Sequence, residues 1–159
     1  GHEAEYEGAP PVYSTGCSGL ITHCERLDDG RFNLVLRGIE KFSIRGEDAP
    51  APGRLYRSAV ISPLEDALRD GDRDELRQLR TRVQELLTPL FSHGIESRLP
   101  EAMPDEDLVN ALAQYLEFDP IEKLALLEQQ GPLARCRSIV ELLEMKAMQP
   151  PGGDPSRVH

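Results

Sequence analysis

Residues 16–45, GCSGLITHCERLDDGRFNLVLRGIEKFSIR, determine the fold of the first part of the chain. On both sides of Asp28-Asp29-Gly30, apolar residues alternate with polar ones, as in strands that bury one face. An Asp-Gly pair tolerates the positive φ that a tight hairpin turn needs. We therefore predict a half-buried antiparallel hairpin whose apolar residues are Leu20, Ile21, Leu27, Phe32, Leu34 and Leu36.

A glycine divides the second arm of this hairpin. After Gly38 the alternation resumes with Phe42 and Ile44, which are interleaved with Lys41, Ser43 and Arg45. A glycine inside a strand is typical of a bulge or a bend. The segment is thus expected to form the wall of a small, curled barrel.

The second half of the chain carries four helix signals. Asp72 and Glu75 have capping-box spacing ahead of a helical apolar period, and Pro104 precedes three acidic residues, which the helix dipole favours in a first turn. Asp119-Pro120-x-Glu122 starts a third helix, and Gly131 ends it ahead of the fourth. The predicted apolar faces are Leu76, Leu79, Val83, Leu86, Leu87 and Leu90; Leu108, Leu112, Tyr115 and Leu116; and Leu133, Cys136, Val140, Leu143 and Ala147.

These patterns together predict an α+β protein. A β-barrel subdomain is expected over residues 1–62 and a bundle of about four helices over residues 72–148. Residues 149–159 are rich in Pro and Gly and have little to bury, so we expect a disordered tail there.

The strand motifs resemble the N-terminal, substrate-binding domain family of Lon proteases. The shared pattern comprises Gly16, Gly19 and Ile21, then Leu27, Asp29, Gly30 and Arg31, then Leu36, Gly38, Lys41, Phe42 and Ile44. A later strand over residues 56–61 and paired helices over residues 112–128 extend the resemblance to roughly residues 12–147. The resemblance implies a small PUA-like partial β-barrel before the bundle. It also implies a bacterial-type, proteolysis-associated module that recognises unfolded or extended polypeptides, or a protease or adaptor partner.

The sequence departs from that family at its start. The family opens with an apolar strand, a Pro-Gly turn and a helix, whereas this chain begins Gly1-His2-Glu3. We therefore expect the first strands of the barrel to be missing and Gly1-His2 to be the remnant of a tag.

Catalytic motifs of full-length Lon proteases are not found in this sequence. It has neither the Gly-x-x-x-x-Gly-Lys-Ser/Thr loop of their ATPase nor their Ser-Lys protease dyad. The prediction is a stand-alone module without enzymatic activity. The alternative is the N-terminal fragment of an ATP-dependent serine protease.

The charge and cysteine content bear on partners and compartment. Twenty-eight acidic and 18 basic residues give a net charge of −10, which disfavours nucleic acid and anionic membranes as partners. An RNA-binding PUA-like module remains a second alternative. Three cysteines in a chain of 159 residues, without a membrane-length apolar run, favour reduced thiols and a cytoplasmic location.

Four groups of residues are candidate sites. Cys17, His23 and Cys24 lack Cys-x-x-Cys spacing and a fourth ligand, so we predict neither a zinc site nor a Cys-His nucleophile there. Cys136 falls on an apolar helical stripe and should be buried. His93 is expected to be a cation at a helix end. The acidic run from Glu101 to Asp107 lacks the alternation of a calcium loop and should be a solvated helix start.

The large side chains of the strands are the remaining candidates for binding. Phe32, Phe42 and Tyr56 are expected to fill the barrel rather than to contact a ligand. The sequence thus assigns no catalytic, cofactor-binding or metal-binding residue. It leaves the substrate-binding residues and the oligomeric state open.

Overall fold

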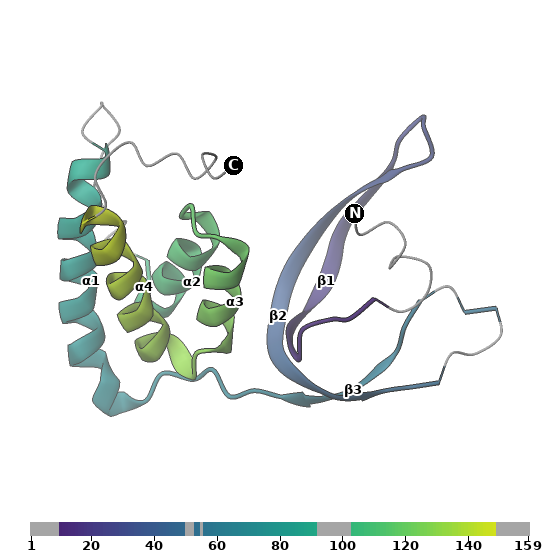
Figure 1. Cartoon of the computed structure of the whole chain (residues 1–159), viewed down its shortest axis with the longest axis horizontal. Coiled ribbons are helices and arrows are strands. Elements are labelled where there is room, and N and C mark those ends of the chain that lie inside the picture. The colour runs from purple at the N-terminus through teal and green to yellow at the C-terminus, as the bar shows by residue number, and fades with distance from the viewer. Residues whose placement is uncertain (1–9, 50–52, 55, 92–102, 149–159) are drawn as a thin grey trace, which may run out of the picture. The chain divides into compact units, whose positions relative to one another are not determined.

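The computed structural model describes residues 10–49, 53–54, 56–91 and 103–148. The chain divides into two compact units, Gly1–Glu65 and Asp66–His159. The first contains three strands and the second contains four α-helices among the described residues (Figure 1). The predicted α+β class is therefore confirmed.

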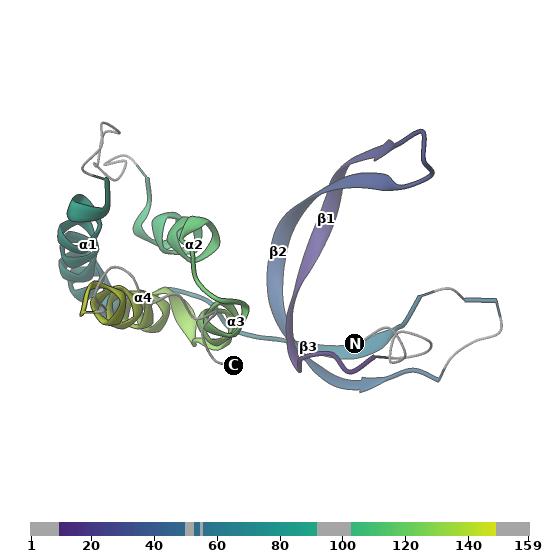
Figure 2. The ribbon, with the colours of Figure 1, turned by 45° about the horizontal axis from the view of Figure 1, so that its top comes forward.

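A three-stranded antiparallel sheet forms the first unit. Its strands are β1 (Thr15–Arg26), β2 (Phe32–Glu47) and β3 (Ala59–Pro63), in the order β1-β2-β3. The long central strand β2 is strongly bent, and it pairs with β1 along most of its length and with β3 at its far end (Figure 2). This curvature gives the sheet the form of a partial barrel.

The turn between β1 and β2 has the predicted conformation. Gly30 lies at φ +86°. Its N–H donates to the Leu27 carbonyl at 3.0 Å, and the Arg31 N–H donates to Asp29 Oδ1, also at 3.0 Å. The Asp-Gly pair thus supplies both the positive φ and a side-chain acceptor for the turn.

Bulges produce the bend of the sheet. The register between β1 and β2 skips Ile39, next to Gly38, and it shifts again at Thr22. A third irregularity skips Arg45 in the register between β2 and β3. The interruption predicted at Gly38 is confirmed, because an extra residue on one strand increases local twist and bending.

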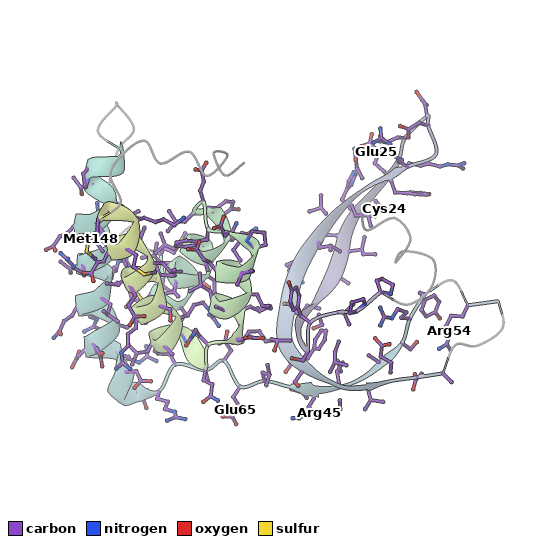
Figure 3. The ribbon with its side chains drawn as sticks, in the orientation of Figure 1. Cys24, Glu25, Arg45, Arg54, Glu65 and Met148 are labelled. Carbon is purple, nitrogen blue, oxygen red and sulfur yellow. The ribbon has the colours of Figure 1, made fainter. Side chains whose placement is uncertain are left out.

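The predicted half-buried hairpin is wrong. Apolar residues of both alternation sets are exposed on β2: the exposed fraction is 57% for Phe32, 54% for Val35 and 66% for Ile39. Side chains project from the strands, and the described residues of this unit include no helix that could cover them (Figure 3). Alternation predicts the two faces of a strand, but it does not show whether another element packs on either face.

Three further expectations for this unit need correction. Tyr56 is 70% exposed instead of filling the barrel. The last strand begins at Ala59 and not at the tyrosine. Lys41, a polar member of the alternation, is buried at 7% exposure where β2 has neighbours on both sides: it is in register with Cys17, and its carbonyl accepts the Leu64 N–H.

The second unit is a helical bundle. It comprises α1 (Arg73–Leu87), α2 (Asp105–Tyr115), α3 (Pro120–Glu128) and α4 (Gly131–Met148), with α1 packed mainly along α4. Its buried core consists of Leu76, Val83, Leu87, Leu108, Val109, Leu112, Phe118, Leu126, Leu133, Cys136, Ile139, Val140 and Leu143. Most of the apolar faces predicted from helical periodicity lie in or against this core. Tyr115 and Ala147 are exposed, contrary to prediction.

The helices start where the sequence predicts, but not every predicted capping hydrogen bond forms. Asp119 is the N-cap of α3, and its N–H donates to Glu122 Oε2 at 2.7 Å, as expected. Asp72 is the N-cap of α1, but its side chain makes no capping hydrogen bond. Glu75 lies instead 2.6 Å from Arg137 of α4. A tertiary ion pair has therefore replaced the predicted capping box.

Candidate functional site

A pocket of about 360 Å³ lies in the first unit, between the start of β1, the end of β2 and the start of β3. Apolar and small side chains dominate its lining, and Glu47 and Arg57 form its charged part. The lining residues are Val12, Tyr13, Thr15, Gly16, Phe42, Ile44, Glu47, Arg57, Ser58 and Ala59.

One wall of the pocket is the segment that precedes β1. The Ser14 carbonyl accepts the N–H of Ile44 at 2.7 Å, so the chain is still paired with β2 there. Residues 10–13 then run alongside the β2–β3 ribbon (Figures 1 and 2). The Arg57 guanidinium donates to the Pro10 carbonyl and pairs with Glu47. Arg57 thereby fixes this wall to the ribbon.

A glycine and an aromatic ring shape the base of the pocket. Gly16 and Phe42 face one another in register across β1 and β2. A Cβ atom at Gly16 would lie 2.7 Å from Phe42 Cζ, which is closer than real Cβ contacts allow. Phe42 therefore lies over Gly16 and shields a backbone that has no side chain of its own.

The pocket combines apolar walls with one charged pair. Its walls offer apolar surface, and its carboxylate and guanidinium are already bound to each other. An apolar cavity with a few fixed polar groups is typical of a ligand site. No lining side chain is a thiol or an imidazole, and the single carboxylate is paired with Arg57.

An open strand edge accompanies the pocket. Among the described residues, β1 and β3 are the outer strands of the sheet, and β1 contributes 12 residues. A strand at the edge of a sheet presents unpaired N–H and C=O groups, which can pair with another extended chain.

The residues considered for metal or nucleophile chemistry lie on β1. Cys17, His23 and Cys24 are exposed, and they stand in register with Lys41, Val35 and Leu34. In the part of the chain that the structure describes, no three His, Cys, Asp or Glu residues are grouped as metal ligands. His93 and Glu101 lie outside the described residues.

The end of the acidic run has a structural role. Asp105, Glu106 and Asp107 occupy the first turn of α2, as predicted. Asp105 lies 2.6 Å from Arg80 of α1, which also donates to the Met103 carbonyl. The run therefore helps to join two helices.

Cys136 lies in the core of the bundle, as predicted, at 1% exposure. Burial and, to a smaller extent, the nearby charge of Asp105 together raise the pKa of its thiol to about 11. A thiol with such a pKa is protonated at neutral pH and is a poor nucleophile.

A buried arginine is the polar centre of the second unit. Arg135 on α4 is 3% exposed and lies 2.6 Å from Asp66, 2.6 Å from Asn110 Oδ1 and 3.1 Å from the Leu126 carbonyl. It thus joins three helices to the segment before α1. The sequence prediction omitted it, although Arg135, Ile139 and Leu143 recur at helical spacing.

The pocket was also missed from the sequence. The sequence predicts Phe42 to be a barrel residue, and no pattern in it marks Arg57 or residues 10–13 as pocket lining. Helical or strand periodicity gives no indication that residues 10–13 lie along a ribbon formed by residues far from them in the chain.

The sequence profile of the ATP-dependent protease La (LON) substrate-binding domain matches residues 1–145. The chain belongs to this family. Its fold is similar to that of the N-terminal domain of a Lon protease from the Mycobacterium avium complex, with a TM-score of 0.62 at 19% identity, covering 86% of this chain and 75% of that one. It is also similar to a Lon N-terminal domain protein from Xanthomonas campestris, with a TM-score of 0.52 at 23% identity, covering 91% and 72% of the two chains.

At these identities the similarity to the two solved structures concerns the fold alone. No curated protein matches the sequence significantly. Among the described residues of this Lon substrate-binding domain, no helix has the length and apolar character needed to cross a membrane.

Proposed function

We propose that this Lon substrate-binding domain is a non-catalytic module that recognises unfolded or extended polypeptides and links them to proteolysis in the cytoplasm. The observation that carries the proposal is an open apolar pocket beside a curled sheet whose outer strands pair with no further strand among the described residues. The family to which the chain belongs is named for substrate binding in an ATP-dependent protease, and this supports the same role.

The geometry supports recognition of extended chains in two ways. An edge strand offers main-chain hydrogen bonds that do not depend on the peptide sequence, and a pocket beside it selects a side chain. A few such contacts leave a modest net affinity after the cost of ordering a flexible peptide. We therefore expect dissociation constants in the micromolar range or weaker.

The charges of the chain support a protein partner over a nucleic acid. The net charge is −10. In the helical unit, Arg77, Arg80 and Arg82 each lie beside a carboxylate. Phosphate binding favours clustered basic side chains, and the net charge would oppose it at long range.

The test is a fluorescence-anisotropy titration of labelled apolar and basic peptides at low and at physiological ionic strength. Apolar peptides are expected to bind, with affinity nearly unchanged by salt, because salt screens exposed charges but barely alters apolar burial. Binding of neither peptide set, or binding of basic peptides alone with loss at physiological salt, would contradict the proposal.

A second assay addresses the absence of catalysis. The purified chain is expected to hydrolyse neither ATP nor an unfolded casein substrate, because its sequence contains neither the phosphate-binding loop nor the Ser-Lys dyad. Turnover of either substrate that persists after contaminating proteases are removed would show that the domain is catalytic.

A further inference from the structure

We propose that the pocket between residues 10–16, β2 and β3 receives one large apolar side chain of an extended polypeptide, which runs beside residues 10–13. The inference rests on the proposed function and specifies where recognition takes place. It identifies the pocket lining, which includes Ala59, as the specificity-determining surface.

The first argument is that the β2–β3 ribbon already holds an extended segment of this kind. Residues 10–13, Pro-Pro-Val-Tyr, contribute two apolar side chains to the pocket, Val12 and Tyr13. Arg57 donates to a main-chain carbonyl of the same segment, at Pro10. The ribbon therefore contacts the apolar side chains of this extended segment and also binds its backbone, through Arg57.

The second argument concerns the openness of the pocket. Val12 is 56% exposed and Tyr13 is 65% exposed, so the wall that they form is open to solvent. A small free molecule is usually enclosed over 70–90% of its surface, by roughly 300–1,000 Å³ of cavity. A side chain attached to a longer peptide needs less enclosure, because contacts of the flanking residues with the strand edge add to its binding.

The third argument concerns charge. Glu47 and Arg57 are the charged groups of the lining, and they are paired with each other. An unpaired ligand charge placed among the apolar walls would lose hydration without gaining a free counter-charge. The pocket therefore selects an uncharged, apolar side chain.

Two substitutions on the same strand test the assignment. Ala59 lines the pocket, whereas its neighbour Val60, which is 57% exposed, points to the other face of β3. Ala59→Leu fills part of the pocket with apolar volume at an exposed strand position. Val60→Leu places the same leucine side chain on the other face of the strand, although it adds only one carbon to the side chain already there. Thermal unfolding of both variants establishes that they remain folded.

The measurement is fluorescence anisotropy on the full chain, with a labelled peptide that carries one phenylalanine among small polar residues. A second peptide has serine in place of the phenylalanine. We expect the phenylalanine peptide to bind at least tenfold more tightly than the serine peptide. We also expect Ala59→Leu to weaken phenylalanine-peptide binding at least tenfold and Val60→Leu to change it less than twofold.

The outcomes separate this inference from the proposed function. If the unmodified chain binds apolar peptides and Ala59→Leu binds them equally well, the pocket assignment is overturned and polypeptide recognition stands. If Val60→Leu weakens binding as much as Ala59→Leu does, the pocket assignment is overturned as well, because the effect does not depend on the face of β3. If the unmodified chain binds no apolar peptide, the proposed function itself is overturned.

Discussion

The hairpin turn requires a positive φ at Gly30, a conformation that residues with a side chain rarely adopt. Gly30 lies at φ +86°, and a Cβ atom there would meet no other atom within 4 Å. A side chain at this position therefore costs backbone strain and not steric overlap. We expect Gly30→Val to lower the free energy of unfolding by about 1–3 kcal/mol, measured by chemical denaturation.

Gly46 provides the matched control for that substitution. It lies in β2 and has no positive φ, and a Cβ atom added there would also meet no other atom within 4 Å. Gly46→Val should therefore change stability by much less than Gly30→Val. Equal stability of the two variants would show that the positive φ at position 30 does not make a residue with a side chain unfavourable.

Cys136 allows a chemical test of burial at the scale of one residue. It is buried, whereas Cys17 and Cys24 are exposed. We expect a thiol-specific reagent to modify two cysteines of the native protein rapidly and the third only after a denaturant is added. Rapid modification of all three in the native state would contradict the packing of α4 in the core.

The same thiol predicts a pH dependence of stability. Burial and the charge of Asp105 raise the pKa of Cys136 to about 11, above the ordinary value of 9.0 that the thiol has in the unfolded chain. Between these pH values the folded state holds a proton that the unfolded state has released, so the free energy of unfolding falls as pH rises. A Cys136→Ala variant should lack this decline. If the free energies of unfolding of the two proteins changed in parallel with pH, Cys136 would not be the cause of the decline.

Residue patterns predicted the turn and the buried thiol because each depends on local chemistry. Gly30 is needed for its φ, and Cys136 follows a helical apolar period; neither requires knowledge of a distant partner. Gly16 shows the limit of this approach. A glycine is needed at position 16 because the ring of Phe42, which lies opposite in register, occupies the place of a Cβ atom. The position of that ring cannot be inferred from the glycine alone.

At the scale of elements, one buried arginine and one exposed arginine of α4 connect this helix to the rest of the bundle. Arg135 is 3% exposed and binds Asp66, Asn110 and a carbonyl. Arg137, two residues further, forms an exposed pair with Glu75. Arg135→Ala removes the hydrogen bond to the carbonyl of the buried residue Leu126 and the charged contacts with Asp66 and Asn110, so it should destabilise the fold by about 2–4 kcal/mol.

Arg137→Ala is the control on the same helix. An exposed ion pair contributes about 0–1 kcal/mol, and the expected loss is of that size. Urea denaturation of both variants compares the two values directly. A loss for Arg137→Ala as large as that for Arg135→Ala would mean that burial does not determine the contribution of these arginines.

Helix boundaries were more predictable than helix contacts. Acidic residues and prolines mark the starts of α2 and α3, where local backbone groups need partners. Glu75 has the local spacing of a capping residue, yet it pairs with Arg137 on another helix. A charged side chain on a long stem has several partners within reach, and the sequence does not say which of them the fold brings closest.

At the scale of the whole chain, the two units differ in how they bury apolar surface. Every residue of the buried hydrophobic core that the structure describes lies between Leu76 and Leu143. The described strands of the first unit leave large apolar side chains exposed, including Leu20, Phe32, Leu36, Ile39 and Val60. Sequence periodicity treated both halves alike, because it reports the pattern of apolar residues and not what covers them.

This difference predicts that the second unit folds by itself. A fragment of residues 66–148 retains the whole described core and the Arg135 cluster, so we expect helical circular dichroism and a cooperative thermal transition. A fragment of residues 1–65 contains none of that core and should show no cooperative transition, since a three-stranded sheet needs a covered apolar face to be stable. An unfolded helical fragment would contradict the inference that the core of the second unit is sufficient for its stability. Cooperative melting of the sheet fragment would contradict the inference that the first unit lacks a stabilising core.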